Sequence, residues 1–145
     1  MAQATPHLLF VCVENSCRSQ MAKGFARALG QTQVRAFSAG SKPSGQVNPR
    51  AVQFMREKQI DLTLQNSKGL DDLPAGTNWD YIVTMGCGDA CPSLPALHRI
   101  DWDLPDPKHL SDAGFRAVRD RIEILVAELI GGAVGSPDSA KEPGR

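Results

Sequence analysis

The amino-acid sequence predicts an α/β protein in which a parallel sheet lies between helical layers. Short β-prone runs occur at 7–12, 33–40 and 80–85, and the first and last are almost continuously apolar, as in strands covered on both faces. Segments with helical periodicity alternate with these runs, which is typical of a parallel sheet. The chain has 145 residues, enough for one domain with a sizeable core. We assign this single three-layer α/β/α domain to residues 1–131 and a flexible tail without periodicity to 132–145.

The first half of the chain supplies two strands and two helices. The strand at 7–12 leads through a polar loop to a helix for which Ser19 is placed as the N-cap. The apolar face of this helix is predicted to contain Met21, Phe25, Ala28 and Leu29. After the strand at 33–40, a helix is predicted from Pro49 to about Lys58, because proline is favoured at the first helical position. Its apolar residues are Val52, Phe54 and Met55.

The second half continues the alternation. Residues 61–79 are irregular, with one short helix expected near Leu70–Leu73. The third strand at 80–85 is followed by a short fourth strand at 97–102. The longest helix is predicted at 112–131, because its apolar residues recur at helical spacing. They are Phe115, Val118, Ile122, Leu125 and Leu129.

Composition and charge narrow the classes of function. The formal net charge is zero, with 22% charged and 41% hydrophobic residues, so we expect neither nucleic-acid nor anionic-membrane binding. No apolar stretch approaches the roughly 18 residues of a membrane helix, and the first residues do not resemble a signal peptide. We therefore expect a cytoplasmic protein, and a monomer by default. In a reducing compartment, four cysteines point to catalysis, redox chemistry or metal binding rather than to structural disulfides.

The predicted order of elements brings three chemically active segments to one edge of the sheet. Parallel sheets bind ligands beyond the carboxyl ends of their strands. Cys12 and the loop 86–92, which contains Cys87 and Cys91, follow two of the predicted strands. Asp106 follows the predicted fourth strand in the same way. The sequence therefore predicts a functional site at this edge.

The loop after the first strand has the composition of an oxyanion-binding site. A cysteine that ends an apolar strand is usually a small core residue, but here the sequence continues to Arg18 and then a helix. A loop wound around a helix N-terminus turns its N–H groups toward an anion, and the arginine fork can hold two oxygens. The same dipoles favour a thiolate and should lower the pKa of Cys12. The predicted oxyanion-binding residues are Val13, Glu14, Asn15, Ser16, Cys17, Arg18 and Ser19.

The stretch CVENSCRSQMAKGFARAL resembles the phosphate-binding loop of the low-molecular-weight protein tyrosine phosphatase fold. Within that superfamily, the chain resembles the arsenate reductases that use three cysteines and a thiol reductant such as thioredoxin. The resemblance extends through FSAG, VTMGCGDACP and WDLPDP and covers nearly everything except the tail. It implies a four-stranded parallel sheet with Cys12 as nucleophile and Arg18 as oxyanion clamp. It also implies that Ser19 hydrogen-bonds the thiolate, that Asn15 shapes the loop and that Cys17 is not essential.

Three cysteines suit a reductase of this type. A phosphatase needs only water after the first attack, whereas a reductase must pass two electrons to As(V), which requires further thiols. We expect Cys87 to attack the Cys12–arsenic adduct and Cys91 to close a Cys87–Cys91 disulfide. The C-x3-C spacing can reach the Cα separation of about 4.4–6.8 Å that a disulfide needs, with rearrangement if the segment is helical. Thioredoxin is the expected reductant, with mycothiol or glutathione and glutaredoxin as alternatives, and phosphate or sulfate as competitors of arsenate.

The main alternative is a low-molecular-weight phosphatase that uses Cys12 and Asp106. The resemblance places a general acid at the Asp106-Pro107 dipeptide, although an aspartate there can also be an ordinary turn residue. Asp101 and Asp103 are neighbouring candidates. The residues that follow Pro107 are not aromatic, unlike those lining the entrance of tyrosyl phosphatases of this fold, and Gln20 stands where those phosphatases have proline. Both departures favour the reductase.

Two other interpretations stay open. Cys87, Cys91 and His98 could form part of a zinc site, although neither a second Cys pair nor an H-x3–5-H spacing completes it. The loop could also belong to a non-catalytic anion or redox sensor.

The sequence departs from the family pattern at three positions. Some of these reductases hold a potassium ion beside the loop with an asparagine, a serine and two carboxylates, and the matching carboxylate positions here are Lys23 and Lys68. We therefore expect no bound cofactor and no potassium, with a lysine ammonium in its place. Glu14 is the third departure, because a carboxylate beside an anion site opposes binding unless it faces water or is neutralised by a lysine or arginine.

Overall fold

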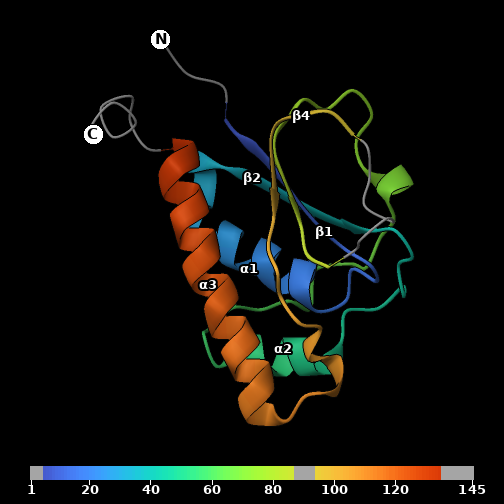
Figure 1. Cartoon of the computed structure of the whole chain (residues 1–145), viewed down its shortest axis with the longest axis vertical. Helices are drawn as coiled ribbons and strands as arrows, with labels where there is room; N and C mark the ends of the chain where they lie inside the picture. The colour runs from blue at the N-terminus through green and yellow to red at the C-terminus, as the bar shows by residue number, and fades with distance from the viewer. Residues whose placement is uncertain (1–4, 87–93, 135–145) are drawn as a thin grey trace.

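The computed structural model describes residues 5–86 and 94–134, and its centre is a four-stranded sheet. All pairings are parallel, and the strand order is β2-β1-β3-β4 (Figure 1). The strands are β1 His7–Cys12, β2 Arg35–Gly40, β3 Trp79–Thr84 and β4 Ala96–Asp101. The predicted α/β class and four-stranded parallel sheet are thus confirmed, with three of the four strands shifted by one or two residues.

Three α-helices and short 3-10 helices connect the strands. The α-helices are α1 Arg18–Gly30, α2 Pro49–Arg56 and α3 Asp112–Val134. The 3-10 helices are η1 Gln31–Gln33, η2 Leu70–Asp72 and η4 Pro107–His109. Pro49 occupies the first turn of α2, as predicted, and the Asn48 side chain caps that helix by accepting the Arg50 N–H at 2.8 Å. No helix among residues 5–86 and 94–134 is long and apolar enough to cross a membrane.

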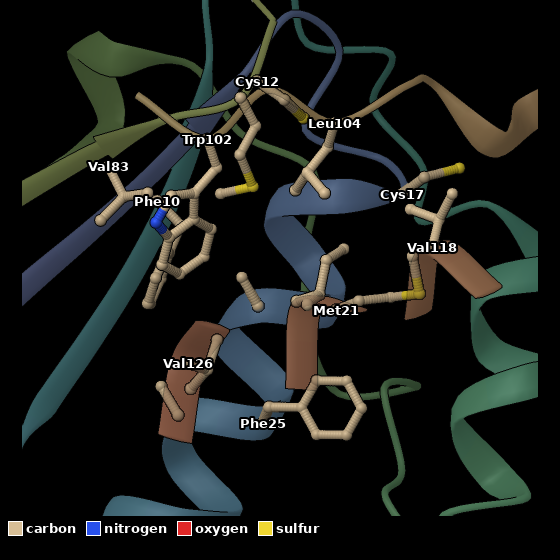
Figure 2. Packing of buried hydrophobic residues seen from close by; sticks show 14 of the residues in the cluster. Phe10, Cys12, Cys17, Met21, Phe25, Val83, Trp102, Leu104, Val118 and Val126 are labelled. Atoms are coloured by element: carbon tan, nitrogen blue, oxygen red, sulfur yellow. The ribbon is translucent and has the colours of Figure 1, made fainter. Parts of the chain in front are cut away.

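Strand alternation divides the core between the two faces of the sheet. Leu8 and Phe10 of β1 face the larger core together with the three helices, whereas Leu9 and Val11 face a smaller core. In Figure 1, α3 runs along the molecule beside α1. Figure 2 shows the larger cluster, in which Phe10, Met21, Phe25, Val118 and Val126 are gathered. The smaller core is covered by apolar residues from η2 and the neighbouring loops, including Leu70, Leu73 and Leu94.

Three local predictions were wrong. Helix α1 begins at Arg18 with Cys17 at the N-cap, so Ser19 lies inside the helix and its side chain is free for another partner. Ala28 and Leu29 are exposed, and the buried face uses Ala22 and Ala26 instead, because residues three and four apart share a helix face. Helix α3 extends to Val134, three residues beyond the predicted end at 131. The remainder of the predicted tail lies outside the described residues.

The strand register brings the carboxyl ends together. Cys12 is paired with Gly40 of β2, Val11 with Thr84 of β3, and Thr84 with Asp101 of β4. The segments that follow these strands therefore leave the sheet at the same edge, as the sequence predicted.

Gly40 permits the close approach of β2 to the loop after β1. A Cβ added at Gly40 would lie 2.5 Å from the Val13 carbonyl oxygen and 2.9 Å from the Asn15 nitrogen, both backbone atoms. The loop would have to shift, so we expect Gly40→Ala to lower the free energy of unfolding by about 1–3 kcal/mol. Gly131→Ala in α3 is the control, because no described atom outside the adjoining helix backbone lies within 4 Å of its added Cβ, and it should stabilise by about 0.5–1 kcal/mol. Thermal denaturation of both variants tests this, and a Gly40→Ala protein as stable as wild type would contradict it.

Candidate active site

A pocket of about 350 Å³ opens at the carboxyl edge of the sheet. Its lining residues are Cys12, Val13, Glu14, Ser16, Cys17, Arg18, Gly86 and Asp106. Segments from three parts of the chain thus meet here, and they include three of the five predicted catalytic residues. The other two, Cys87 and Cys91, lie outside the described residues, although Gly86, which precedes Cys87, lines the pocket. Asn15 and Ser19 do not line the pocket and are fully buried.

The Cys12 sulfur shares a buried hydrogen bond with the Ser19 hydroxyl. Its Sγ lies 2.9 Å from the Ser19 Oγ, which accepts a hydrogen bond from the Asn15 Nδ2 at 2.7 Å. The Lys68 backbone N–H can only donate, and it reaches the Asn15 Oδ1 at 2.8 Å. The Asn15 side chain must therefore present its NH₂ group to Ser19. The Ser19 hydroxyl thus keeps a hydrogen that it can donate to the sulfur of Cys12, and it must be the donor when Cys12 is a thiolate, which can only accept.

Asn15 itself is fixed by a buried network that the sequence analysis missed. Its φ of 52° lies in the left-handed region, which asparagine tolerates better than most residues. The Gln20 Nε2 reaches the Asn15 carbonyl oxygen and Oδ1, both at 2.9 Å, and the Asn66 carbonyl oxygen at 2.8 Å. The Gln65 Nε2 donates to the Gln20 Oε1 at 2.7 Å. Gln20 was noted only as a departure from proline, because nothing in the sequence shows which loop reaches it.

The loop backbone turns donors toward the concave side. The carbonyl oxygens of Val13 and Ser16 accept N–H groups from the segment 42–48, at 2.8 Å and 3.0 Å. In a planar trans peptide the next N–H points opposite to the carbonyl, so the N–H groups of Glu14 and Cys17 point away from that segment. Together with the N-terminus of α1, these donors favour an anion.

Arg18 is buried and oriented by two neighbours. Its Nη1 donates to the Leu104 carbonyl oxygen at 3.1 Å, and its Nη2 lies 3.8 Å from the Asp106 Oδ2. Its Nε is buried without a hydrogen-bond partner in the described part of the chain. Gly86 makes room for this guanidinium, because a Cβ added at Gly86 would lie 2.5 Å from Nη1. Its φ of +78° also favours glycine over residues that carry a side chain. Arg18 is therefore positioned to bind an oxyanion.

Asp106 lies at the mouth of the pocket. Its side chain is half exposed, and its Oδ1 accepts the Lys108 backbone N–H at 3.0 Å, which caps η4. The competing Asp101 accepts the Thr84 hydroxyl at 2.6 Å, and neither it nor Asp103 lines the pocket. Asp106 is thus the one of these three aspartates that lies where it could protonate a ligand in the pocket. Its role as general acid stays a prediction.

Cys17 differs from Cys12 in its surroundings. Burial, aided by the negative charges of Asp106 and Cys12, raises the pKa of the Cys17 thiol to about 12. Cys17 is therefore a neutral thiol near neutral pH and is a poor nucleophile. This agrees with the expectation that it has no essential role.

Glu14 has a partner that the sequence did not identify. The Lys108 Nζ lies 2.9 Å from its Oε1 and 3.1 Å from its Oε2. The hydrogen bond and negative charge of Glu14 raise the pKa of Lys108. The sequence analysis expected a neutralising lysine or arginine, but 94 positions separate the two residues and only the tertiary structure joins them.

The residues beside the loop do not fit a cation. Burial, the charges of Lys68 and Arg27 and a hydrogen bond with Lys68 lower the pKa of Lys23 to about 8. The Asn15 Oδ1 already accepts two N–H groups, from Gln20 and Lys68. Two basic side chains and an occupied amide oxygen are a poor set of ligands for a metal ion, which binds oxygen donors.

The zinc alternative gains no support from the described residues. Residues 5–86 and 94–134 contain no group of three His, Cys, Asp or Glu side chains that could hold a metal. His98 instead stacks on Tyr81 with ring centroids 4.7 Å apart. Because Cys87 and Cys91 lie outside the described residues, this alternative stays untested.

These features define an α/β protein with a thiol and a buried arginine in one oxyanion pocket. The family model described as low molecular weight phosphotyrosine protein phosphatase matches residues 7–136. The chain therefore belongs to this family.

Similar proteins include several reductases. A glutaredoxin arsenate reductase from Synechocystis sp. is 38% identical over 129 residues, which cover 84% of this chain and 97% of that protein. The solved structure of an arsenate reductase in the phosphate binding state matches with a TM-score of 0.79 at 35% identity, covering 88% of this chain and 98% of that one. A thioredoxin-dependent arsenate reductase from Corynebacterium glutamicum matches with a TM-score of 0.74 at 28% identity, covering 92% of this chain and 64% of that one.

Lys23 should make stability depend on pH. Its pKa is about 8 in the folded protein and 10.5 ordinarily, so below pH 8 the folded state carries a disfavoured charge. Between these values the unfolded chain binds more protons, and the contribution to the free energy of unfolding rises with pH. We expect Lys23→Met to raise Tm by a few degrees near pH 7, with the gain shrinking toward pH 10. Thermal melts across this range test it, with Lys42→Met, an exposed lysine, as control. A gain independent of pH would contradict it.

Proposed function

We propose that the protein is an arsenate reductase that converts arsenate to arsenite. The main support for this proposal is the position of the Cys12 thiol, which shares a hydrogen bond with Ser19 and lies in one pocket with Arg18. This arrangement suits nucleophilic attack on a tetrahedral oxyanion. The names of the similar proteins, which are arsenate reductases, support arsenate as that oxyanion.

The first step forms a covalent adduct without electron transfer. The Cys12 sulfur attacks As(V), and one arsenate oxygen leaves as water after protonation. Asp106, at the mouth of the pocket, is the proposed proton donor. Arg18 and the loop N–H groups stabilise the negative oxygens that remain on arsenic.

The second and third steps carry the electrons. The Cys87 thiolate attacks the Cys12 sulfur, a Cys12–Cys87 disulfide forms, and the electron pair of the broken S–As bond reduces As(V) to As(III). The Cys91 thiolate then attacks Cys87, which closes a Cys87–Cys91 disulfide and releases the Cys12 thiolate. A dithiol reductant restores both thiols and is itself oxidised.

Thioredoxin is the proposed reductant, because a disulfide between two cysteines of one chain suits dithiol exchange. The similar proteins include a glutaredoxin arsenate reductase and a thioredoxin-dependent one, so both reductants belong in any assay. A relay that needs free thiols suits a reducing compartment, and we propose the cytoplasm. We also propose that the protein acts as a monomer and that phosphate or sulfate competes with arsenate.

Disulfide mapping tests the relay. Reduced protein is exposed to arsenate, free thiols are blocked, and the products are analysed by mass spectrometry. We expect an arsenate-dependent Cys87–Cys91 disulfide in wild type, a trapped Cys12–Cys87 disulfide in Cys91→Ser, and neither in Cys12→Ser, which lacks the nucleophile. Cys17→Ser, the matched control, should still form Cys87–Cys91. Arsenate-independent formation of the same disulfide would contradict the relay.

Phosphatase activity is proposed only as a weak side reaction. Attack by Cys12 and protonation by Asp106 would be common to both activities. None of the described residues that line the pocket is aromatic, so this lining supplies no ring against which a tyrosyl group could stack. Hydrolysis of p-nitrophenyl phosphate should therefore be slow compared with arsenate reduction.

We propose that the lysine pair replaces a potassium ion beside the loop. The ammonium groups of Lys23 and Lys68 supply positive charge there, and the backbone N–H of Lys68 binds the Asn15 Oδ1. We expect no potassium-specific change in turnover when KCl replaces NaCl at constant ionic strength. Tm should change by no more than about 1 °C, because a bound ion that contributed about 1 kcal/mol would raise it by several degrees. A rise specific to potassium would contradict the proposal.

A further inference from the structure

The oxyanion pocket contains a carboxylate that should weaken it. Glu14 and Asp106 both line this pocket. Asp106 lies 3.8 Å from the Arg18 guanidinium, so its charge is partly balanced within the pocket. An unbalanced Glu14 would repel a doubly negative ligand, because a unit charge a few ångströms away acts strongly where water is partly excluded.

Lys108 balances this charge from outside the pocket. Its Nζ contacts both carboxylate oxygens of Glu14, at 2.9 Å and 3.1 Å. Lys108 does not line the oxyanion pocket but an adjoining pocket of about 190 Å³, which shares Glu14 and Ser16 with the first. Glu14 therefore lies between the two pockets, and Lys108 binds its carboxylate from the side of the smaller pocket.

The contribution of this ion pair to stability is small. The two side chains are 36% and 39% exposed, and exposed pairs of this kind contribute on the order of 0–1 kcal/mol. Removal of either charge should therefore leave the fold intact. The main consequence of the pair must be electrostatic and local.

We propose that Lys108 is a positioning residue that determines affinity for doubly charged oxyanions by neutralising Glu14 and drawing its carboxylate away from the anion. The inference rests on the proposed function only in requiring that the pocket around Cys12 binds a tetrahedral oxyanion. Lys108 acts through Glu14 and does not touch the substrate.

A purely structural bridge would give a different pattern. The Lys108 backbone also binds its neighbours, since its N–H reaches Asp106 at 3.0 Å and its carbonyl oxygen accepts from the Arg50 Nη1 at 3.2 Å. If the side-chain contact mattered only as a link between the loop and η4, loss of either partner would break it equally. If charge matters, loss of Lys108 and loss of Glu14 must have opposite effects.

The experiment measures the Kd of inorganic phosphate for the reduced protein by isothermal titration calorimetry near pH 8, where phosphate is doubly charged. We expect Lys108→Met to weaken binding about tenfold, which equals about 1.4 kcal/mol. Glu14→Gln should tighten binding about threefold. The double variant should lie within about twofold of wild type, because it removes both charges of the pair and leaves its net charge at zero, and because the effects of two residues in contact are not additive. The Lys108→Met effect should shrink in high salt.

The matched control is Lys42→Met. Lys42 is exposed, and its backbone N–H donates to the Val13 carbonyl oxygen of the same loop, so this variant removes an equal charge beside the loop. It should change Kd by less than about twofold, because exposed charges are screened. An equal loss in Lys42→Met and Lys108→Met would overturn the inference.

Three further outcomes would also overturn it. Equal weakening in Lys108→Met, Glu14→Gln and the double variant would assign the pair a bridging role instead. Wild type that binds no phosphate would refute the oxyanion pocket, and with it both the proposed function and this inference. Normal wild-type binding with no change in Lys108→Met would refute the inference alone.

Discussion

The site depends on one backbone hydrogen bond, from the Lys68 N–H to the Asn15 Oδ1. A backbone amide cannot reverse its polarity, so this bond fixes the orientation of the Asn15 side chain. The Asn15 NH₂ group then donates to Ser19 and leaves the Ser19 hydrogen available for a Cys12 thiolate. The donor comes from a loop far along the chain, and the Gly40 N–H holds that loop by donating to the Lys68 carbonyl oxygen at 2.9 Å. The β1–β2 pairing is therefore linked to the chemistry of the thiol, because a displaced β2 would displace the group that orients Asn15.

Charge around the loop is balanced by different means on different sides. Arg18 is buried where an oxyanion would bind, and Lys108 neutralises Glu14 at the rim. Lys23 lies next to Lys68, and its pKa is lowered to about 8. A pocket that gathers anions must avoid carboxylates or compensate them, and this chain does the latter for Glu14. A half-buried lysine beside another lysine is unfavourable for folding.

Much of the fold was predictable because the signals are local. The apolar runs and helical spacing gave the four strands and the three α-helices, since side-chain burial follows periods of two and about 3.6 residues. Errors arose where tertiary packing overrides local preference. Ser19 was assigned to the helix N-cap, but its hydroxyl is used by Cys12 and Asn15, and the N-cap lies two residues earlier, at Cys17. Leu29 was assigned to the core, but it remains 46% exposed near the end of α1.

By itself, the sequence determined that a cysteine and an arginine flank a short loop between a strand and a helix, and that two more cysteines follow the third strand. These residue types and spacings suffice to predict a thiol that attacks an oxyanion, because the loop geometry is local. Tertiary structure alone decided which distant groups complete the site. The partners Glu14 and Lys108, Gln20 and Gln65, and Arg18 and Leu104 are each separated by more than 40 positions. Such pairs arise only when the sheet register places separate loops at one edge, and no local pattern in the sequence encodes that meeting.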